Sequence, residues 1–434
     1  MANAKKAEGE HAVRRPRDAG TAAPASRAVA VPHAWLIALT VLLVLPWLVV
    51  AVLYLRSAEE PASPVASTVT ASAEARATGP WGHLTATPIV VSPPLEYVAA
   101  DWSRTDAPDT WYFPSTSADE LEEFFVFVGL SREQARGLRS NARPDPRSRG
   151  LVVTPDDGLV RTMAPEVRAR LYLQLAKSTL NFDQVNSFRF LGSSSEAWLG
   201  GSLISRETRQ LVEPLIYSDG QFLHFADTEL VRSQIADRAE LQRLAKALLR
   251  QATVLVRLSV RDASEVEGLA DYWGRGGRRL DLRPLLESVV GLDRSIDIVH
   301  LLPTFARENM YRYPRISTAD LIEPQLANCL WTSLNFFRQE PDDRFRDINV
   351  ALAVLRRDYY VVEHGFQLGD IVAFLDEEGD LYHVAVYLAD GLVFTKNGMS
   401  PMAPWSIMTI DQVKGYYKAR TEDPRLIYHR RNDF

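Results

Sequence analysis

The chain has 434 residues, with 49 Lys and Arg against 55 Asp and Glu, a net charge of −6 and one cysteine, Cys329. The length suffices for two or three domains, and 17 Phe, 15 Tyr and 9 Trp exclude a wholly disordered chain. The charge balance lacks the basic excess typical of nucleic-acid binding, and one cysteine excludes an intrachain disulfide and a multi-cysteine zinc site. Three roles remain for Cys329: an inert core residue, a target of external redox chemistry, or a nucleophile.

A long uncharged segment follows a basic N-terminus. Residues 34–55 are long enough to cross a hydrocarbon core of ~30 Å as a helix, and they exceed a signal-peptide core of about 7–15 residues. We expect an uncleaved anchor here, with a cleaved signal peptide as the alternative. The positive-inside rule then predicts that residues 1–33 are cytoplasmic and that the remainder is outside. Residues 56–95, rich in Ala, Ser, Thr and Pro, are expected to be a flexible tether.

The middle region, residues 96–310, has the signals of a helix-rich α+β domain. Ser117 and Ser131 each begin a capping box, which predicts two helix starts. Residues 215–225 read as a hairpin with Asp219-Gly220 at the turn. The segment resembles no characterised family.

The C-terminal third shows two helical segments and then closely spaced strands. Such an order predicts a compact α+β unit with an antiparallel sheet. The expected helices are 325–339 and 348–357, and the expected strands are 370–376, 381–389, 392–397 and 425–430.

Cys329 and His383 are the candidate catalytic pair. Cys329 is predicted near the start of a helix, whose positive end lowers the pKa of a thiol. Core packing is the alternative, because Leu330 and Trp331 beside it are apolar. Strand alternation places His383 on the same face as the small Ala385, which leaves room for another group to approach.

The third polar residue depends on one hairpin loop. A three-residue loop, with Gly391 in the left-handed conformation, would pair His383 with Asn397 and so place an amide opposite the imidazole. A two-residue loop would shift the register and bring Lys396 or Gly398 opposite instead. Thr395, on the same face, is the rival of Asn397.

These motifs resemble a known family. A cysteine at a helix start, the segment 366–374 (FQLGDIVAF) and the segment 383–391 (HVAVYLADG) are similar to the NlpC-type, papain-like cysteine peptidases of the bacterial envelope. The resemblance covers residues 311–434. It implies a papain-like fold in which Cys329 is the nucleophile and His383 the general base and acid.

By the same resemblance, the third catalytic residue is Thr395 by spacing or Asn397 by chemistry, and neither a cofactor nor a metal ion is expected. The sequence departs from the family at Asn328, where Asp is usual, and at Leu330, where Ser is usual. Trp331 replaces a small residue, so the substrate groove is expected to differ from one that accepts peptidoglycan.

The predicted function is that of a membrane-anchored cysteine amidohydrolase or endopeptidase acting on cell-wall peptide or another envelope amide. The alternative is a non-catalytic envelope binding or scaffold protein with an inactive papain-like domain. The expected partners are the inner membrane and a peptidoglycan or envelope peptide, without nucleic acid. The C-terminal domains are expected in the periplasm or otherwise outside the cytoplasm. The expected organisation is a tail (1–33), a transmembrane anchor (34–55), a tether (56–95), a helix-rich α+β domain (96–310) and an NlpC-like domain (311–434).

Overall fold

The computed structural model shows an α+β fold built on antiparallel sheets. The expected fold class is wrong in its N-terminal transmembrane helix: none of the helices that the structure describes is long and apolar enough to span a bilayer. The expected tail and anchor segment lie outside the described residues. Those residues are 73–98, 110–146, 148–291, 294–314, 327–398 and 403–434.

The C-terminal region contains the predicted antiparallel sheet, which has six strands in the order β11-β16-β12-β13-β14-β15. Runs of Val, Ile, Leu and Phe, which favour extended backbone, form its centre. The strands are β11 (Tyr359–Val362), β12 (Ile371–Leu375), β13 (Leu381–Ala389), β14 (Leu392–Lys396), β15 (Trp405–Thr409) and β16 (Arg425–Arg431).

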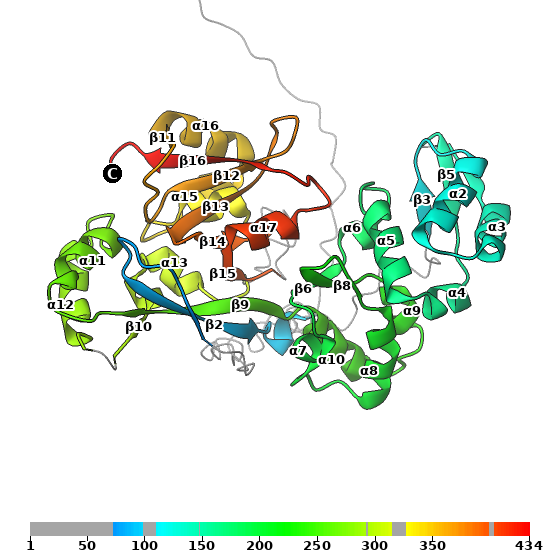
Figure 1. Cartoon of the computed structure of the whole chain (residues 1–434), viewed down its shortest axis with the longest axis horizontal. Helices are drawn as coiled ribbons and strands as arrows, with labels where there is room; N and C mark the ends of the chain where they lie inside the picture. The colour runs from blue at the N-terminus through cyan, green and yellow to red at the C-terminus, as the bar shows by residue number, and fades with distance from the viewer. Residues whose placement is uncertain (1–72, 99–109, 147, 292–293, 315–326, 399–402) are drawn as a thin grey trace, which may run out of the picture. The chain divides into compact units, whose positions relative to one another are not determined.

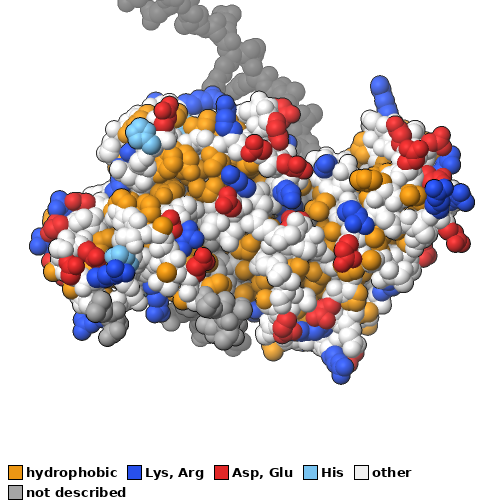
Figure 2. All heavy atoms as spheres, in the orientation of Figure 1, with side chains coloured by type: hydrophobic (Ala, Val, Ile, Leu, Met, Phe, Trp, Pro, Cys, Tyr) orange, Lys and Arg blue, Asp and Glu red, His pale blue; other side chains and the backbone are white. Residues whose placement is uncertain are grey.

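Both faces of this sheet are covered (Figure 1). Helices α15 (Cys329–Leu334) and α16 (Ile348–Asp358) belong to one face, where α15 packs against β13 and β14. Helix α17 (Ile410–Tyr416) belongs to the other face. In Figure 2, hydrophobic side chains gather over this region on the viewed face, and acidic and basic side chains are interspersed around it.

The end of the expected tether is instead part of a sheet. Residues 83–91 form strand β2, which pairs along its whole length with β9 (Gln251–Ser259). The composition of small residues concealed the alternation that buries Leu84 and Ala86. The remaining strands of this sheet are β1 (Glu74–Ala75) and β10 (Ile296–Asp297).

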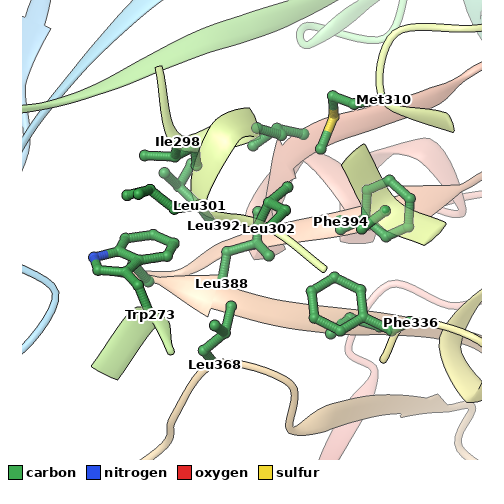
Figure 3. Packing of buried hydrophobic residues seen from close by; sticks show 14 of the residues in the cluster. Trp273, Ile298, Leu301, Leu302, Met310, Phe336, Leu368, Leu388, Leu392 and Phe394 are labelled. Atoms are coloured by element: carbon green, nitrogen blue, oxygen red, sulfur yellow. The ribbon is translucent and has the colours of Figure 1, made fainter. Parts of the chain in front are cut away.

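One hydrophobic core crosses the expected boundary between residues 310 and 311 (Figure 3). Trp273 and Leu301, from the middle region, belong to the same buried cluster as Leu388 and Phe394 of the C-terminal sheet. Thr253 of β9 also donates a hydrogen bond from its hydroxyl to the carbonyl oxygen of residue 407, at 2.8 Å. The two regions are therefore packed together as one unit.

The rest of the middle region has a second core, made by short helices and two three-stranded sheets. The predicted capping boxes at Ser117 and Ser131 are confirmed, as is the turn at Asp219-Gly220. The strands are β3 (Trp111–Phe113), β4 (Arg143–Asp145), β5 (Gly150–Val153), β6 (Phe188–Leu191), β7 (Tyr217–Ser218) and β8 (Phe222–Phe225). The helices of residues 96–310 are α2 (Ala118–Val128), α3 (Arg132–Asn141), α4 (Asp157–Thr162), α5 (Pro165–Leu175), α6 (Phe182–Val185), α7 (Ser195–Leu199), α8 (Arg206–Val212), α9 (Thr228–Arg232), α10 (Arg238–Leu248), α11 (Glu265–Trp273), α12 (Arg279–Ser288) and α13 (Thr304–Asn309).

The hairpin between β13 and β14 has a two-residue loop, so the expected three-residue loop is wrong. Asp390 and Gly391 both have positive φ, at 48° and 72°, as a tight hairpin turn of this length requires. A bulge before Ala389 then restores the register, and Val386 lies opposite Phe394. Continued along the strands, this register is the one that the longer loop would have produced.

The Gly369-Asp370 pair has a structural role at the entry to β12. Gly369 has a φ of 92°, and a Cβ atom there would lie 2.1 Å from the ring of Phe337. The buried Asp370 carboxylate accepts hydrogen bonds from the Arg430 guanidinium at 2.8 and 2.7 Å and from the backbone N–H of Gln367 at 2.8 Å. The two residues thus hold the strand entry in place.

Gly369→Ala is expected to destabilise the protein by ~2 kcal/mol or more, because the left-handed backbone and the Phe337 ring both oppose a methyl group. Gly379→Ala is the matched control, since Gly379 has a similar φ of 87° and its added Cβ would meet only an arginine nitrogen at 3.9 Å. Urea denaturation measures both. Equal losses would show that the contact with Phe337 has no energetic effect.

Candidate functional site

His383 lies on the face of the sheet that includes α17. Its side chain is buried, at 1% exposure. The imidazole lies against the ring of Tyr417, with 4.7 Å between centroids, and 5.6 Å from that of Phe374. This burial lowers the pKa of His383 to about 3, so the ring is neutral at pH 7.

A chain of hydrogen bonds joins His383 to both candidate third residues. His383 Nε2 lies 2.9 Å from Thr395 Oγ1, and the Thr395 hydroxyl donates to Asn397 Oδ1 at 3.3 Å. The Thr395 hydroxyl proton is used in the bond to Asn397. The bond between Thr395 and His383 therefore needs a proton on Nε2, which donates to the Thr395 oxygen. The neutral ring therefore has its free lone pair on Nδ1.

The Nδ1 atom of His383 is buried and has no hydrogen-bond partner among the residues that the structure describes. A buried polar atom without a partner calls for an explanation, and a catalytic role is one such explanation. Nδ1 is therefore the atom at which His383 can accept a proton.

Cys329 is the first residue of α15, and the Asn328 side chain caps the helix by accepting a hydrogen bond from the N–H of Trp331 at 2.8 Å. The helix ends at Leu334, earlier than expected, because the buried Asn335 side chain instead accepts a hydrogen bond from the backbone of Asp342. A helix of six residues has a weak dipole. The expected lowering of the thiol pKa is wrong here, since burial raises the pKa of Cys329.

The Cys329 sulfur lies beside the strand that carries His383. Backbone hydrogen bonds from Val384, Leu330 and Cys329 itself favour the thiolate and partly oppose the effect of burial. The pairing of β13 with β14 in the described sheet runs from Val386 to Ala389 and does not reach Val384. The structure thus places the thiol beside Val384, on the α15 face of the sheet, and the His383 ring on the α17 face. No hydrogen bond joins thiol and imidazole among the described atoms.

Lys396 is a charged neighbour of the thiol that the sequence did not single out. It alternates with Thr395 along β14 and so faces the α15 side of the sheet. Its strand partner Trp405 donates a hydrogen bond to Thr332 of α15 at 3.0 Å. Burial lowers the pKa of Lys396 to about 7, while the Cys329 thiolate favours its charged form.

Lys396→Met is expected to stabilise the fold by roughly 3 kcal/mol at pH 6 and to raise the pKa of the Cys329 thiol further. Between pH 7 and about 10.4 the lysine is protonated in the unfolded chain and neutral in the folded chain. The stability gained by the substitution should therefore disappear as pH rises through this window. Urea denaturation and iodoacetamide alkylation, each against pH, measure the two effects. Lys414→Met, at the more exposed Lys414, is the control and should change neither.

Comparisons with known proteins give no match to a family model, a curated protein or a solved structure. The likeness to NlpC-type peptidases therefore rests on the motifs of residues 311–434 alone. Within the described ranges, no group of three or more His, Cys, Asp or Glu side chains is arranged to hold a metal ion.

Proposed function

We propose that this protein is a cysteine hydrolase that cleaves an amide bond, with Cys329 as nucleophile and His383 as general base. The observation that carries the proposal is the buried, unpartnered Nδ1 of His383, next in the chain to the residue whose backbone bonds the Cys329 sulfur. Thr395 and Asn397 support the assignment because they hold the imidazole in the tautomer that leaves Nδ1 free.

The reaction begins from a neutral pair, because burial opposes charge on both the thiol and the imidazole. The proposed reaction requires the thiol and Nδ1 of His383 to meet beyond the end of the β13–β14 pairing. The thiol proton then moves to Nδ1 as sulfur attacks the carbonyl carbon. The imidazolium then gives its proton to the departing amine, which leaves a thioester on Cys329. Water, deprotonated by Nδ1, attacks the thioester; the acid is released and the proton returns to sulfur.

The substrate is proposed to be a peptide of the cell wall or another envelope amide, which rests on the motif resemblance. The test is incubation of the full chain, Cys329→Ala and Cys329→Ser with purified peptidoglycan, followed by mass spectrometry of the soluble fragments. Peptides with new termini should appear with the wild-type chain alone. Identical fragment profiles from all three proteins would exclude cell-wall peptide as the substrate.

A panel of N-acyl amino-acid p-nitroanilides tests the reaction apart from the substrate. A Cys329-dependent release of nitroaniline would support amide cleavage even when peptidoglycan is left intact. Absence of release from both classes would favour the non-catalytic binding protein, whose thiol and imidazole stay neutral and separate.

A further inference from the structure

A second group of hydrogen-bonded side chains lies in the middle region, outside the site of Cys329. Ser187 immediately precedes β6, His224 lies in β8, and Asp219 lies in the turn between β7 and β8. Strands β6 and β8 pair in antiparallel fashion, with Arg189 opposite His224. The pairing brings the three side chains together from separate points of the chain.

The three side chains form one hydrogen-bonded array. His224 Nδ1 lies 3.2 Å from Ser187 Oγ, and His224 Nε2 lies 3.0 Å from Asp219 Oδ2. The other oxygen of Asp219 accepts hydrogen bonds from the backbone N–H groups of Gln221 and Phe222, at 2.9 and 2.7 Å. This carboxylate is therefore fixed in orientation, and it orients the imidazole in turn.

The protons of the array have one consistent arrangement. Burial acts against the charge of Asp219, but hydrogen bonds from His224 and the backbone of Phe222 outweigh it and bring the pKa of Asp219 to about 2. An ionised carboxylate only accepts hydrogen bonds, so Nε2 of His224 must carry the proton. Nδ1 then has a lone pair directed at the Ser187 hydroxyl, so the array has the proton order of a Ser-His-Asp triad with the roles of the two ring nitrogens exchanged.

The array lines a cavity of about 260 Å³. Ser187 and His224 are nearly buried, at 8% and 5% exposure, so the cavity is their route to a ligand. Its wall includes Arg170, Lys177, Arg189 and Lys418 but only two acidic side chains, Asp219 and Glu422. Four cations against two anions favour a small ligand that carries negative charge.

We propose that Ser187, His224 and Asp219 form a serine esterase site for small esters whose acyl group carries a carboxylate. The Ser187 hydroxyl gives its proton to His224 Nδ1 as its oxygen attacks the ester carbonyl, and Asp219 stabilises the imidazolium. The imidazolium then protonates the departing alcohol and leaves an acyl group on Ser187. Water attacks this ester with His224 as base, the acid departs, and Ser187 regains its proton.

The site is tested on the full chain with a fluorophosphonate probe, which modifies activated serines, followed by peptide mass spectrometry. Cys329→Ala is used alongside the wild type, so that failure of the cysteine site does not affect the result. Ser187 should be modified at least tenfold faster in the folded chain than in the heat-denatured chain. His224→Gln should abolish the difference, whereas Ser218→Ala, on the neighbouring strand β7, should not. An unmodified Ser187 in the folded chain would overturn the proposal.

The charge preference has its own measurement. The p-nitrophenyl ester of succinate should be hydrolysed with a kcat/KM about tenfold above that of the butyrate ester. The ratio should approach one in Lys177→Ala/Lys418→Ala, because these lysines line the cavity and take no part in the hydrogen bonds of the array. An unchanged ratio in the double variant would refute the preference for an anionic substrate. If the wild-type chain hydrolyses neither ester and Ser187 is not labelled, Ser187 is not the nucleophile.

Discussion

His383→Gln is expected to lower the rate of amide hydrolysis by ~10²–10⁴-fold, because it removes the general base of the proposed reaction. Glutamine keeps a polar side chain of similar reach but cannot accept a proton at neutral pH. The measurement is kcat/KM on the best substrate from the p-nitroanilide panel, with thermal unfolding to establish that the variant is folded. An unchanged kcat/KM in the folded variant would remove His383 from the mechanism.

Two further variants separate catalysis from structure. Thr395→Val removes the acceptor at Nε2, so the tautomer is no longer fixed and activity should fall, although less than in His383→Gln. His429→Ala is the matched control, since His429 belongs to β16 of the same sheet and has no part in the hydrogen-bonded chain. A loss with His429→Ala equal to that with His383→Gln would indicate a general effect of changing the sheet.

Arg168→Met is expected to destabilise the fold by ~3–5 kcal/mol, because it leaves the carboxylate of Asp227 buried without its charge partner. The Arg168 side chain is fully buried, with Nε 3.3 Å from Asp227 Oδ2 and Nη1 donating to the carbonyl oxygen of Pro214 at 2.8 Å. Burial raises the pKa of Asp227 to about 6 even with the arginine present. Urea denaturation at several pH values measures the loss.

The pH dependence of this loss has a definite sign. Without Arg168, the pKa of Asp227 should rise further, so protonation in the folded state stabilises the variant as pH falls. The loss should therefore be larger at pH 8 than at pH 5. Arg168→Met/Asp227→Asn should recover part of it, and Arg209→Met, at a partly exposed ion pair with Glu196, should cost about 0–1 kcal/mol. A loss of stability that does not change with pH would show that the charge of Asp227 is not its cause.

Local signals in the sequence predicted many of the elements. The capping boxes at Ser117 and Ser131, the hairpin at Asp219-Gly220 and four of the six strands of the C-terminal sheet follow from hydrogen bonds and alternation within short segments. Strands β11 and β15 were not predicted. The prediction failed where the deciding partner is distant. Strand β2 was missed because residues 83–91 look like part of a linker until β9, more than 150 residues later, pairs with them.

In the candidate site, too, some features follow from local sequence and others depend on the tertiary structure. The residues alone show a single cysteine, and their alternation predicts a histidine on one strand and Thr395 on the next. Asn397 was expected on that strand too, but β14 ends at Lys396 and Asn397 follows it. Tertiary structure decided the tautomer of His383, the approach of Cys329 to Val384, and the burial that keeps both groups neutral. The position of Lys396 beside the thiol was also decided there. The physical reason is that strand periodicity is local, whereas desolvation and charge pairing depend on atoms that folding brings together from distant positions.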